Sequence, residues 1–289
     1  MLEGLLVPMF TGIKSDESVA IDETVAHAAW LVKSGVDGLV PFGTFGEGAS
    51  LSLSEKIRLT DEILKVSGSA KVVPSLICNS LGEIAEYLEF ANSSKVDGVM
   101  VMPPGYFRPG DDGALTKFFE KVLQLSKKPV IAYNFPGMSL TIAPKVLSGL
   151  GVWGVKDSSG SIDSAKAYLD SKVKVLVGSD ALLAQAISLG ASGGICGIAN
   201  FFPRRMKRIY DLAKLGKLEE AGREIAPIAE FSNGIVQEGF TPGLAISAFK
   251  SAAAKFIPTP LGNMRTPVPR IETDFARWSK SLEYSEIDN

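Results

Sequence analysis

Residues that bind metals or form disulfides are scarce in this sequence. Among its 289 residues there are one histidine and two cysteines. Metal-dependent aldolases and hydrolases normally use several imidazoles or a cluster of carboxylates. His27 lies between Ala26 and Ala28 in a segment patterned as an outer helix, so we expect it to be structural and expect no metal or other cofactor. Cys78 and Cys196 lie in apolar runs, which predicts buried free thiols in a reducing compartment.

An excess of one charge and long apolar runs are also missing. The 30 basic and 32 acidic residues leave a net charge of −2. Without a basic cluster or stripe, a nucleic acid or an anionic membrane is not expected as a partner. No apolar run approaches the ~18 residues of a membrane span, and Glu3 and Pro8 interrupt an N-terminus without a basic leader. We expect a cytoplasmic protein whose partners are small molecules and copies of itself.

Short apolar runs, by contrast, recur along the chain. Apolar residues make up 46% of the sequence, which suits one barrel-sized domain. Helical patterns separate the runs; Ser52 and Glu55, for example, form a capping box before an apolar stripe. This alternation predicts an α/β fold, a (β/α)₈ TIM barrel of parallel strands covered by helices. The strand-like runs occupy residues 5–10, 38–42, 72–78, 96–102, 129–134, 152–156, 173–178 and 193–198.

The sequence after the eighth run predicts additional helices. Gly239, Pro242, Pro258 and Pro260 interrupt these helical patterns. We therefore place the (β/α)₈ barrel at residues 1–217 and a C-terminal helical extension, packed on the barrel, at residues 218–289. The helical patterns cover residues 204–215, 218–236, 244–256 and 272–282.

Lys156 is the strongest candidate for a catalytic residue. It ends the apolar run that begins at Val152 and precedes a Ser/Gly turn. Parallel α/β barrels keep their chemistry at the carboxyl ends of the strands, and a lysine withdrawn from water there is a nucleophile for ketones. By itself, a lysine in this place is more often a surface side chain or the ion-pair partner of its neighbour, here Asp157.

Tyr133 stands at the end of the preceding run, in Tyr133-Asn134-Phe135-Pro136. Adjacent barrel strands lie ~5 Å apart, so Tyr133 and Lys156 can both reach one small substrate. The alternative is a packing residue whose hydroxyl has a hydrogen-bond partner.

Glycine-containing turns follow three other strand-like runs. In Gly43-Thr44-Phe45-Gly46-Glu47, the glycines let backbone N–H groups turn toward a carboxylate. Gly178-Ser179-Asp180 and Gly193-Gly194-Ile195-Cys196-Gly197 would add hydroxyl-binding groups and close backbone approach to the same rim. Each turn alone is equally compatible with a tight turn or a helix cap.

Together, these motifs resemble the dihydrodipicolinate synthase / N-acetylneuraminate lyase superfamily of class I, Schiff-base aldolases. The resemblance covers nearly the whole chain, and the combination is specific although each motif alone is weak. The matching motifs are Gly43-Thr44-Phe45-Gly46-Glu47, Pro103-Pro104-Gly105-Tyr106, Tyr133-Asn134-Phe135-Pro136, Gly154-Val155-Lys156-Asp157 and Gly178-Ser179-Asp180.

The resemblance implies a role for each matching residue. Lys156 would form the imine with a 2-keto acid, and Tyr133 would shuttle protons at the substrate. Thr44 and the N–H of Phe45 would bind the carboxylate of the keto acid. Tyr106 matches the tyrosine that family members lend across a tight dimer interface, which implies a homotetramer built as a pair of dimers. The remaining expected substrate contacts are Gly178, Ser179, Asp180 and Gly197.

Three departures from the family pattern narrow the expected activity. Phe45 stands where most members have a second hydroxyl residue, so one side-chain hydrogen bond to the carboxylate is missing. Gly137-Met138-Ser139 lacks the arginine with which synthases hold the second carboxylate of aspartate semialdehyde. Ala181 follows Asp180, where sialate lyases have a glutamate for sugar hydroxyls. The pattern is similar to that of archaeal-type 2-keto-3-deoxygluconate aldolases.

The reaction expected from this resemblance is reversible cleavage of 2-keto-3-deoxygluconate to pyruvate and glyceraldehyde, with the 6-phospho form as a further candidate substrate. A protonated imine on Lys156 would act as the electron sink. The alternatives are dihydrodipicolinate synthase, N-acetylneuraminate lyase, or a keto-acid dehydratase that uses the same lysine. A non-catalytic small-molecule sensor is disfavoured, since a sensor needs neither Lys156 nor Tyr133.

Overall fold

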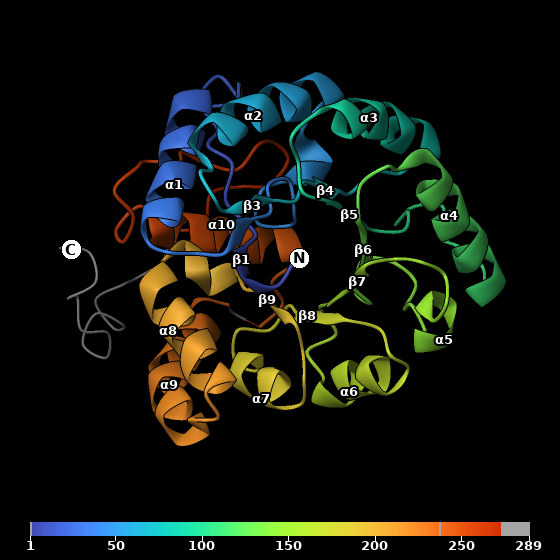
Figure 1. Cartoon of the computed structure of the whole chain (residues 1–289). Helices are drawn as coiled ribbons and strands as arrows, with labels where there is room; N and C mark the ends of the chain where they lie inside the picture. The colour runs from blue at the N-terminus through green and yellow to red at the C-terminus, as the bar shows by residue number, and fades with distance from the viewer. Residues whose placement is uncertain (1, 237, 273–289) are drawn as a thin grey trace.

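A curled parallel sheet forms the centre of the molecule and helices surround it, as the computed structural model shows for residues 2–236 and 238–272 (Figure 1). Every strand pairs in parallel with its neighbours, in the order β3-β2-β1-β9-β8-β7-β6-β5-β4. This arrangement resembles a TIM barrel. The strands are β1 (Gly4–Val7), β2 (Gly38–Leu39), β3 (Lys71–Val72), β4 (Ser75–Leu76), β5 (Val99–Val101), β6 (Val130–Asn134), β7 (Gly154–Asp157), β8 (Val175–Val177) and β9 (Gly193–Ile195).

The sheet has nine strands in the described residues, where eight runs were predicted, because the third run is divided. Pro74 lies between β3 and β4 and has no N–H for the ladder. Hydrogen bonds nevertheless continue on both sides of this break. Val73 N–H donates to Leu39 O (2.9 Å) toward β2, and Met100 N–H donates to Pro74 O (2.9 Å) toward β5. One stretch of chain therefore joins the two ends of the sheet.

Helices cover the outside of the sheet in the order that the sequence predicts. The capping box at the start of α2 is confirmed: Ser52 accepts a hydrogen bond from Glu55 N–H, and Glu55 accepts one from Ser52 N–H. Two 3₁₀ helices, η1 (Gly48–Ser50) and η2 (Gly197–Asn200), lie beyond strand ends. The surrounding helices are α1 (Ile21–Lys33), α2 (Leu53–Val66), α3 (Leu81–Ser93), α4 (Asp112–Leu125), α5 (Pro144–Leu147), α6 (Ile162–Asp170), α7 (Leu183–Ser188) and α8 (Pro203–Lys214).

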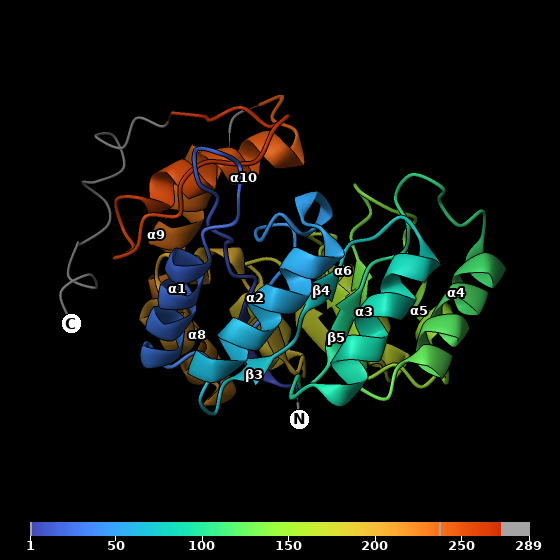
Figure 2. The same ribbon diagram turned by 90° about the horizontal axis from the view of Figure 1, so that it is seen from above.

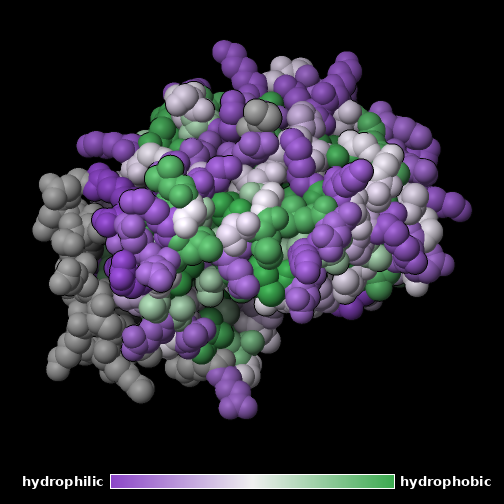
Figure 3. All heavy atoms as spheres, turned by 60° about the horizontal axis from the view of Figure 1, so that its bottom comes forward, coloured by the Kyte–Doolittle hydropathy of each residue, from purple (hydrophilic) through white to green (hydrophobic). Residues whose placement is uncertain are grey.

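Apolar side chains fill both faces of the sheet. Successive strand residues point to opposite faces, so Leu5 joins the cluster under the helices and Leu6 joins the cluster inside the sheet. The inner cluster also contains Tyr133 and Ile195. Hydrophilic side chains project around much of the molecular face in Figure 3, and hydrophobic ones show in patches between them.

The C-terminal helices lie on the barrel in two different ways. Helix α9 (Leu218–Ile235) packs beside α8, whereas α10 (Pro242–Ala253) lies across the end of the barrel away from the N-terminus (Figure 2). The helices predicted at 218–236 and 244–256 are thus confirmed. The helical pattern predicted at 272–282 lies almost entirely outside the described residues.

His27, Cys78 and Cys196 are all buried. The Nε2 of His27 lies 2.9 Å from Asn200 Oδ1, and burial lowers the pKa of the imidazole to about 4. Both cysteines are free, as expected. Within residues 2–236 and 238–272, no group of three or more His, Cys, Asp or Glu side chains is placed to hold a metal ion. No helix in the same stretch of chain has the length and apolar character needed to span a bilayer.

Candidate active site

A cavity of about 350 Å³ opens at the carboxyl ends of the strands, within the size range of small-molecule sites. Turns after the strands supply one wall and the C-terminal segment supplies the other. The lining residues are Pro8, Thr44, Phe45, Tyr133, Phe135, Lys156, Ser158, Gly160, Gly178, Ser179, Ile195, Gly197, Phe240, Pro242, Ala245, Ile246 and Phe249.

Lys156 and Tyr133 meet inside this cavity. They are direct partners in the register of β6 and β7, and Lys156 Nζ lies 4.2 Å from the centroid of the Tyr133 ring. Lys156 is 5% exposed, so its amine is withdrawn from bulk water. Asp157 points to the other face of the strand, where it accepts hydrogen bonds from Asn134 Nδ2 (2.8 Å) and Ser159 Oγ (3.0 Å). Asp157 is therefore held by these two residues, and the amine is directed to the cavity.

Thr44 reaches the same pair from the loop after β2. Its Oγ1 lies 3.0 Å from the hydroxyl of Tyr133. The loop is sharply folded, since Phe42 and Glu47 adopt left-handed φ values of 63° and 55°. Such values are uncommon for residues other than glycine and are concentrated at functional sites. The loop thus brings a hydroxyl to the end of a neighbouring strand.

Gly48 is needed for this loop, and its replacement by alanine should destabilise the protein. A Cβ at Gly48 would lie 1.8 Å from the carbonyl oxygen of Phe42, and backbone cannot move aside cheaply. We expect Gly48→Ala to lower the free energy of unfolding by about 3 kcal/mol, measured by urea denaturation. Gly222→Ala is the control, because Gly222 lies in α9 with open space around its Cβ position. Equal stability of the two variants would contradict the prediction.

Phe45 contributes an aromatic wall to the cavity. Its ring packs against Phe10 and Phe249, each with a centroid distance of 5.5 Å. Gly197 makes room for this ring, since a Cβ there would lie 2.3 Å from Phe45 Cζ. The side chain that replaces the expected second hydroxyl therefore packs against α10.

The turn after β8 divides its residues between two roles. Gly178 and Ser179 line the cavity. Asp180 is not among the residues lining this cavity; its Oδ1 accepts a hydrogen bond from Ile198 N–H (3.1 Å) and joins the turn to η2. Burial raises the pKa of Asp180 to about 6, although that hydrogen bond and the charge of Lys156 oppose the rise.

Asp180 should make the protein less stable as the pH rises from about 4 to about 6. The folded state keeps a proton in this window that the unfolded chain, with a pKa near 3.8, releases. Asp180→Asn keeps an oxygen for Ile198 N–H and removes the charge of this partly buried side chain. We expect this variant to be roughly 2 kcal/mol more stable than wild type at pH 7, with the gain lost below pH 4. Urea denaturation across this range tests it, and a difference that does not vary with pH would refute it.

Tyr106 does not line the cavity of the chain to which it belongs. Its side chain is 80% exposed and that of Phe107 is 79% exposed, and the two rings contact each other edge to face at 4.9 Å. Tyr106 lines a separate hollow of about 320 Å³, together with Arg108 and Met138. A single chain therefore brings Lys156, Tyr133 and Thr44 together but not Tyr106.

Sequence reasoning missed the contribution of the C-terminal segment. Its pattern predicted a helix near α10 but gave no sign that this helix would form a wall of the cavity. Ser158, directly after β7, was also not predicted to line the cavity. Its hydroxyl follows the strand that carries Lys156, and this position could have indicated it. The unanticipated lining residues of the C-terminal segment are Phe240, Pro242, Ala245, Ile246 and Phe249.

Comparison with known proteins agrees with this architecture. The solved structure of a variant of 2-keto-3-deoxygluconate aldolase from Sulfolobus solfataricus superposes with a TM-score of 0.85 at 24% identity, covering 98% of this chain and 95% of that chain. A sialic acid aldolase from Ruminococcus gnavus, solved as a catalytic lysine mutant, superposes with a TM-score of 0.88 at 18% identity, covering 99% and 95%. These likenesses show the fold.

Sequence relatives and a family model show the family. The 4-hydroxy-tetrahydrodipicolinate synthase of Methanosarcina acetivorans is 30% identical over 280 residues, which are 93% of this chain and 92% of the relative. A DapA-like lyase of Halobacterium salinarum, uncharacterised, is 28% identical over 287 residues, 94% of this chain and 90% of the relative. The model of the dihydrodipicolinate synthetase family matches residues 1–276. With a buried lysine and tyrosine at the carboxyl ends of its parallel strands, the chain belongs to the dihydrodipicolinate synthetase family of aldolase-type lyases.

Proposed function

We propose that this protein is a class I lyase that forms an imine between Lys156 and a 2-keto acid, and that it cleaves 2-keto-3-deoxygluconate to pyruvate and glyceraldehyde. The observation that carries this proposal is the buried Lys156 amine 4.2 Å from the Tyr133 ring centroid, in the cavity that also contains Thr44. A binding protein without catalysis needs neither an amine nucleophile nor a proton carrier in this place.

The proposed reaction uses these groups in turn. Lys156 Nζ attacks C2 of the keto acid, one proton is taken up from solvent and water leaves, giving a protonated imine. The imine accepts the electron pair of the C3–C4 bond as glyceraldehyde departs, so that no free carbanion forms. The Tyr133 hydroxyl carries one proton from the C4 hydroxyl to C3 of the resulting enamine. Hydrolysis of the imine then releases pyruvate and the amine, while Thr44 and the Phe45 N–H hold the carboxylate.

The polar groups of the cavity favour a neutral, hydroxylated remainder of the substrate. Ser158 and Ser179 line the same cavity as Thr44 and offer two further hydroxyls. Among the lining residues in the described part of the chain, Lys156 supplies the one basic side chain. Once Lys156 is bonded to C2, the described lining residues offer no second cation for another carboxylate or a phosphate. This favours the unphosphorylated sugar acid over its 6-phospho form and over aspartate semialdehyde.

Dihydrodipicolinate synthesis is the second candidate, favoured by the names of relatives that are 28–30% identical over most of the chain. The site offers it less support. Met138 stands in the loop where the resemblance places the carboxylate-binding arginine of the synthases, and it lines the hollow beside Tyr106.

We further propose that Tyr106 acts across an interface in a tetramer built as a pair of dimers. Its 80% exposed ring, beside the 79% exposed Phe107, supports a surface that a second copy covers. Sedimentation of the wild type and of Tyr106→Ala tests this assembly, and an active wild-type monomer would contradict it.

Borohydride trapping combined with a substrate panel tests the main proposal. Pyruvate and borohydride should give a stable adduct on Lys156, located by mass analysis of the peptides. The panel consists of 2-keto-3-deoxygluconate, its 6-phosphate, N-acetylneuraminate, and pyruvate with aspartate semialdehyde. Release of glyceraldehyde from the first compound supports the aldolase, whereas keto-acid consumption without an aldehyde indicates a dehydratase. An adduct on a different lysine would overturn the assignment.

A further inference from the structure

A buried ion pair joins α10 to the loop that carries Thr44. Lys250 Nζ lies 2.6 Å from Glu47 Oε1, and each side chain is 1% exposed. Glu47 lies in this loop, which runs from Thr44 to Ser50; it adopts a left-handed conformation, and its N–H donates to Thr44 O (3.2 Å). Two charges buried in this way are costly unless further hydrogen bonds satisfy them. This pair is therefore an unusual way to hold together two segments 203 residues apart.

The segment after α10 supplies those further hydrogen bonds. Lys250 Nζ also donates to Asn263 O (2.6 Å), and Arg265 N–H donates to Glu47 Oε2 (3.0 Å). Both oxygens of the Glu47 carboxylate thus have a donor. The Lys250 ammonium and the Glu47 carboxylate therefore each have a second partner besides one another.

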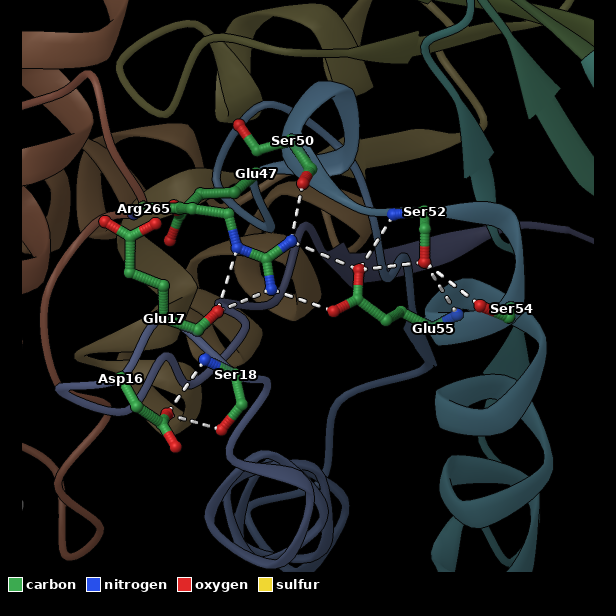
Figure 4. A network of polar contacts seen from close by, with 9 residues as sticks. All are labelled: Asp16, Glu17, Ser18, Glu47, Ser50, Ser52, Ser54, Glu55 and Arg265. Carbon is green, nitrogen blue, oxygen red and sulfur yellow. Dashed lines mark hydrogen bonds and ion pairs between the residues drawn. The ribbon is translucent and has the colours of Figure 1, made fainter.

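Arg265 connects the same segment to the start of α2 (Figure 4). Its guanidinium binds both oxygens of Glu55, at 2.8 and 3.1 Å, and its Nη1 donates to Ser50 O (2.6 Å). Its Nε donates to Glu17 O (3.0 Å). Bidentate contacts of this kind fix direction as well as distance. The loop from Thr44 to Ser50 is thereby held at its far end by the C-terminal segment.

Helix α10 lines the cavity through Phe249, the residue that precedes Lys250. Phe249 lines the cavity, and its ring packs on Phe45, the neighbour of Thr44. The Thr44 loop therefore meets α10 twice, once through the Phe45–Phe249 rings and once through the Glu47–Lys250 charges. The ion pair thus involves the loop that carries Thr44 and helix α10. Lys156 and Tyr133 lie on other elements, the strands β7 and β6.

We propose that Glu47 and Lys250 are positioning residues, which set the place of Thr44 over the Tyr133–Lys156 pair and hold α10 against the cavity. The inference rests on the proposed function, in which the Thr44 loop binds the carboxylate of the keto acid. Displacement of such a contact by about 1 Å is enough to weaken substrate use strongly. Loss of the pair should thus weaken binding of the keto acid, while the reacting groups on β6 and β7 remain in place.

Lys250→Met and Lys250→Arg test the proposal. We expect Lys250→Met to raise the pyruvate concentration that half-saturates borohydride trapping, and the KM for the keto acid, about tenfold, with kcat within about threefold of wild type. Lys250→Arg keeps the charge and should recover part of the loss. Lys65→Met is the matched control, because the Lys65–Glu62 pair has a similar N–O distance of 2.7 Å but an exposed lysine. It should match wild type.

Each outcome decides between two claims. If wild type gives an adduct on Lys156 and Lys250→Met needs no more than twice the pyruvate, the positioning role is wrong and the proposed function stands. If kcat falls as much as KM rises, or if Lys250→Arg is no better than Lys250→Met, the role is general folding and the proposal fails. If wild type gives no adduct, both claims fail. Should Lys250→Met not fold, Glu47→Gln/Lys250→Met, which removes both charges, takes its place with the same criteria.

Discussion

Lys156→Ala is expected to lower kcat for keto-acid cleavage at least about 10⁴-fold, because Lys156 supplies the one primary amine among the described residues that line the cavity. Borohydride trapping with pyruvate should fail in the same variant. Activity with the substrate panel and the mass of the trapped protein check both expectations.

Lys174→Ala is the matched control for this prediction. Lys174 Nζ also lies over an aromatic ring, 5.1 Å from the centroid of Trp153, but its side chain is 47% exposed and does not line the cavity. A general effect of removing a lysine from an aromatic ring would appear in both variants. Turnover by Lys156→Ala at the wild-type rate would remove the basis of the proposed mechanism.

Tyr133→Phe is expected to lower kcat by about 10²- to 10⁴-fold while pyruvate can still be trapped on Lys156. The variant keeps the ring beside the amine and removes only the hydroxyl, together with its 3.0 Å contact to Thr44 Oγ1. Imine formation should continue because the nucleophile is untouched, and cleavage should slow because its proton carrier is gone. Single-turnover kinetics with 2-keto-3-deoxygluconate separates the two steps.

Tyr87→Phe controls for the loss of a buried tyrosine hydroxyl. Tyr87 is fully buried, and its hydroxyl lies 2.6 Å from Thr60 Oγ1, so it reproduces the tyrosine–threonine contact away from the cavity. Tyr87→Phe should affect stability more than kcat. If Tyr133→Phe is as active as Tyr87→Phe, another group moves the proton.

The division of the third strand-like run and the hydrogen-bond partner of Asp180 were not predicted from the sequence. The apolar run 72–78 predicted one strand, and the structure has two there, β3 and β4. Pro74 separates them, since a proline supplies no N–H to the ladder. Asp180 was expected to contact substrate hydroxyls because it follows a strand end. That contact stays a prediction, and the structure adds that the carboxylate accepts from Ile198 N–H, a partner 18 residues away that no local pattern indicates.

The amino-acid sequence alone determined the alternation of strands and helices and the placement of Lys156 and Tyr133 at neighbouring strand ends. These features are local: parallel strands covered on both faces must be continuous apolar runs, and the residue at the carboxyl end of such a run lies at the rim where neighbouring runs also end. The tertiary structure alone decided that α10 forms a wall of the cavity and that Lys250 meets Glu47. Those contacts join positions about two hundred residues apart, and only the packing of the finished barrel brings them together.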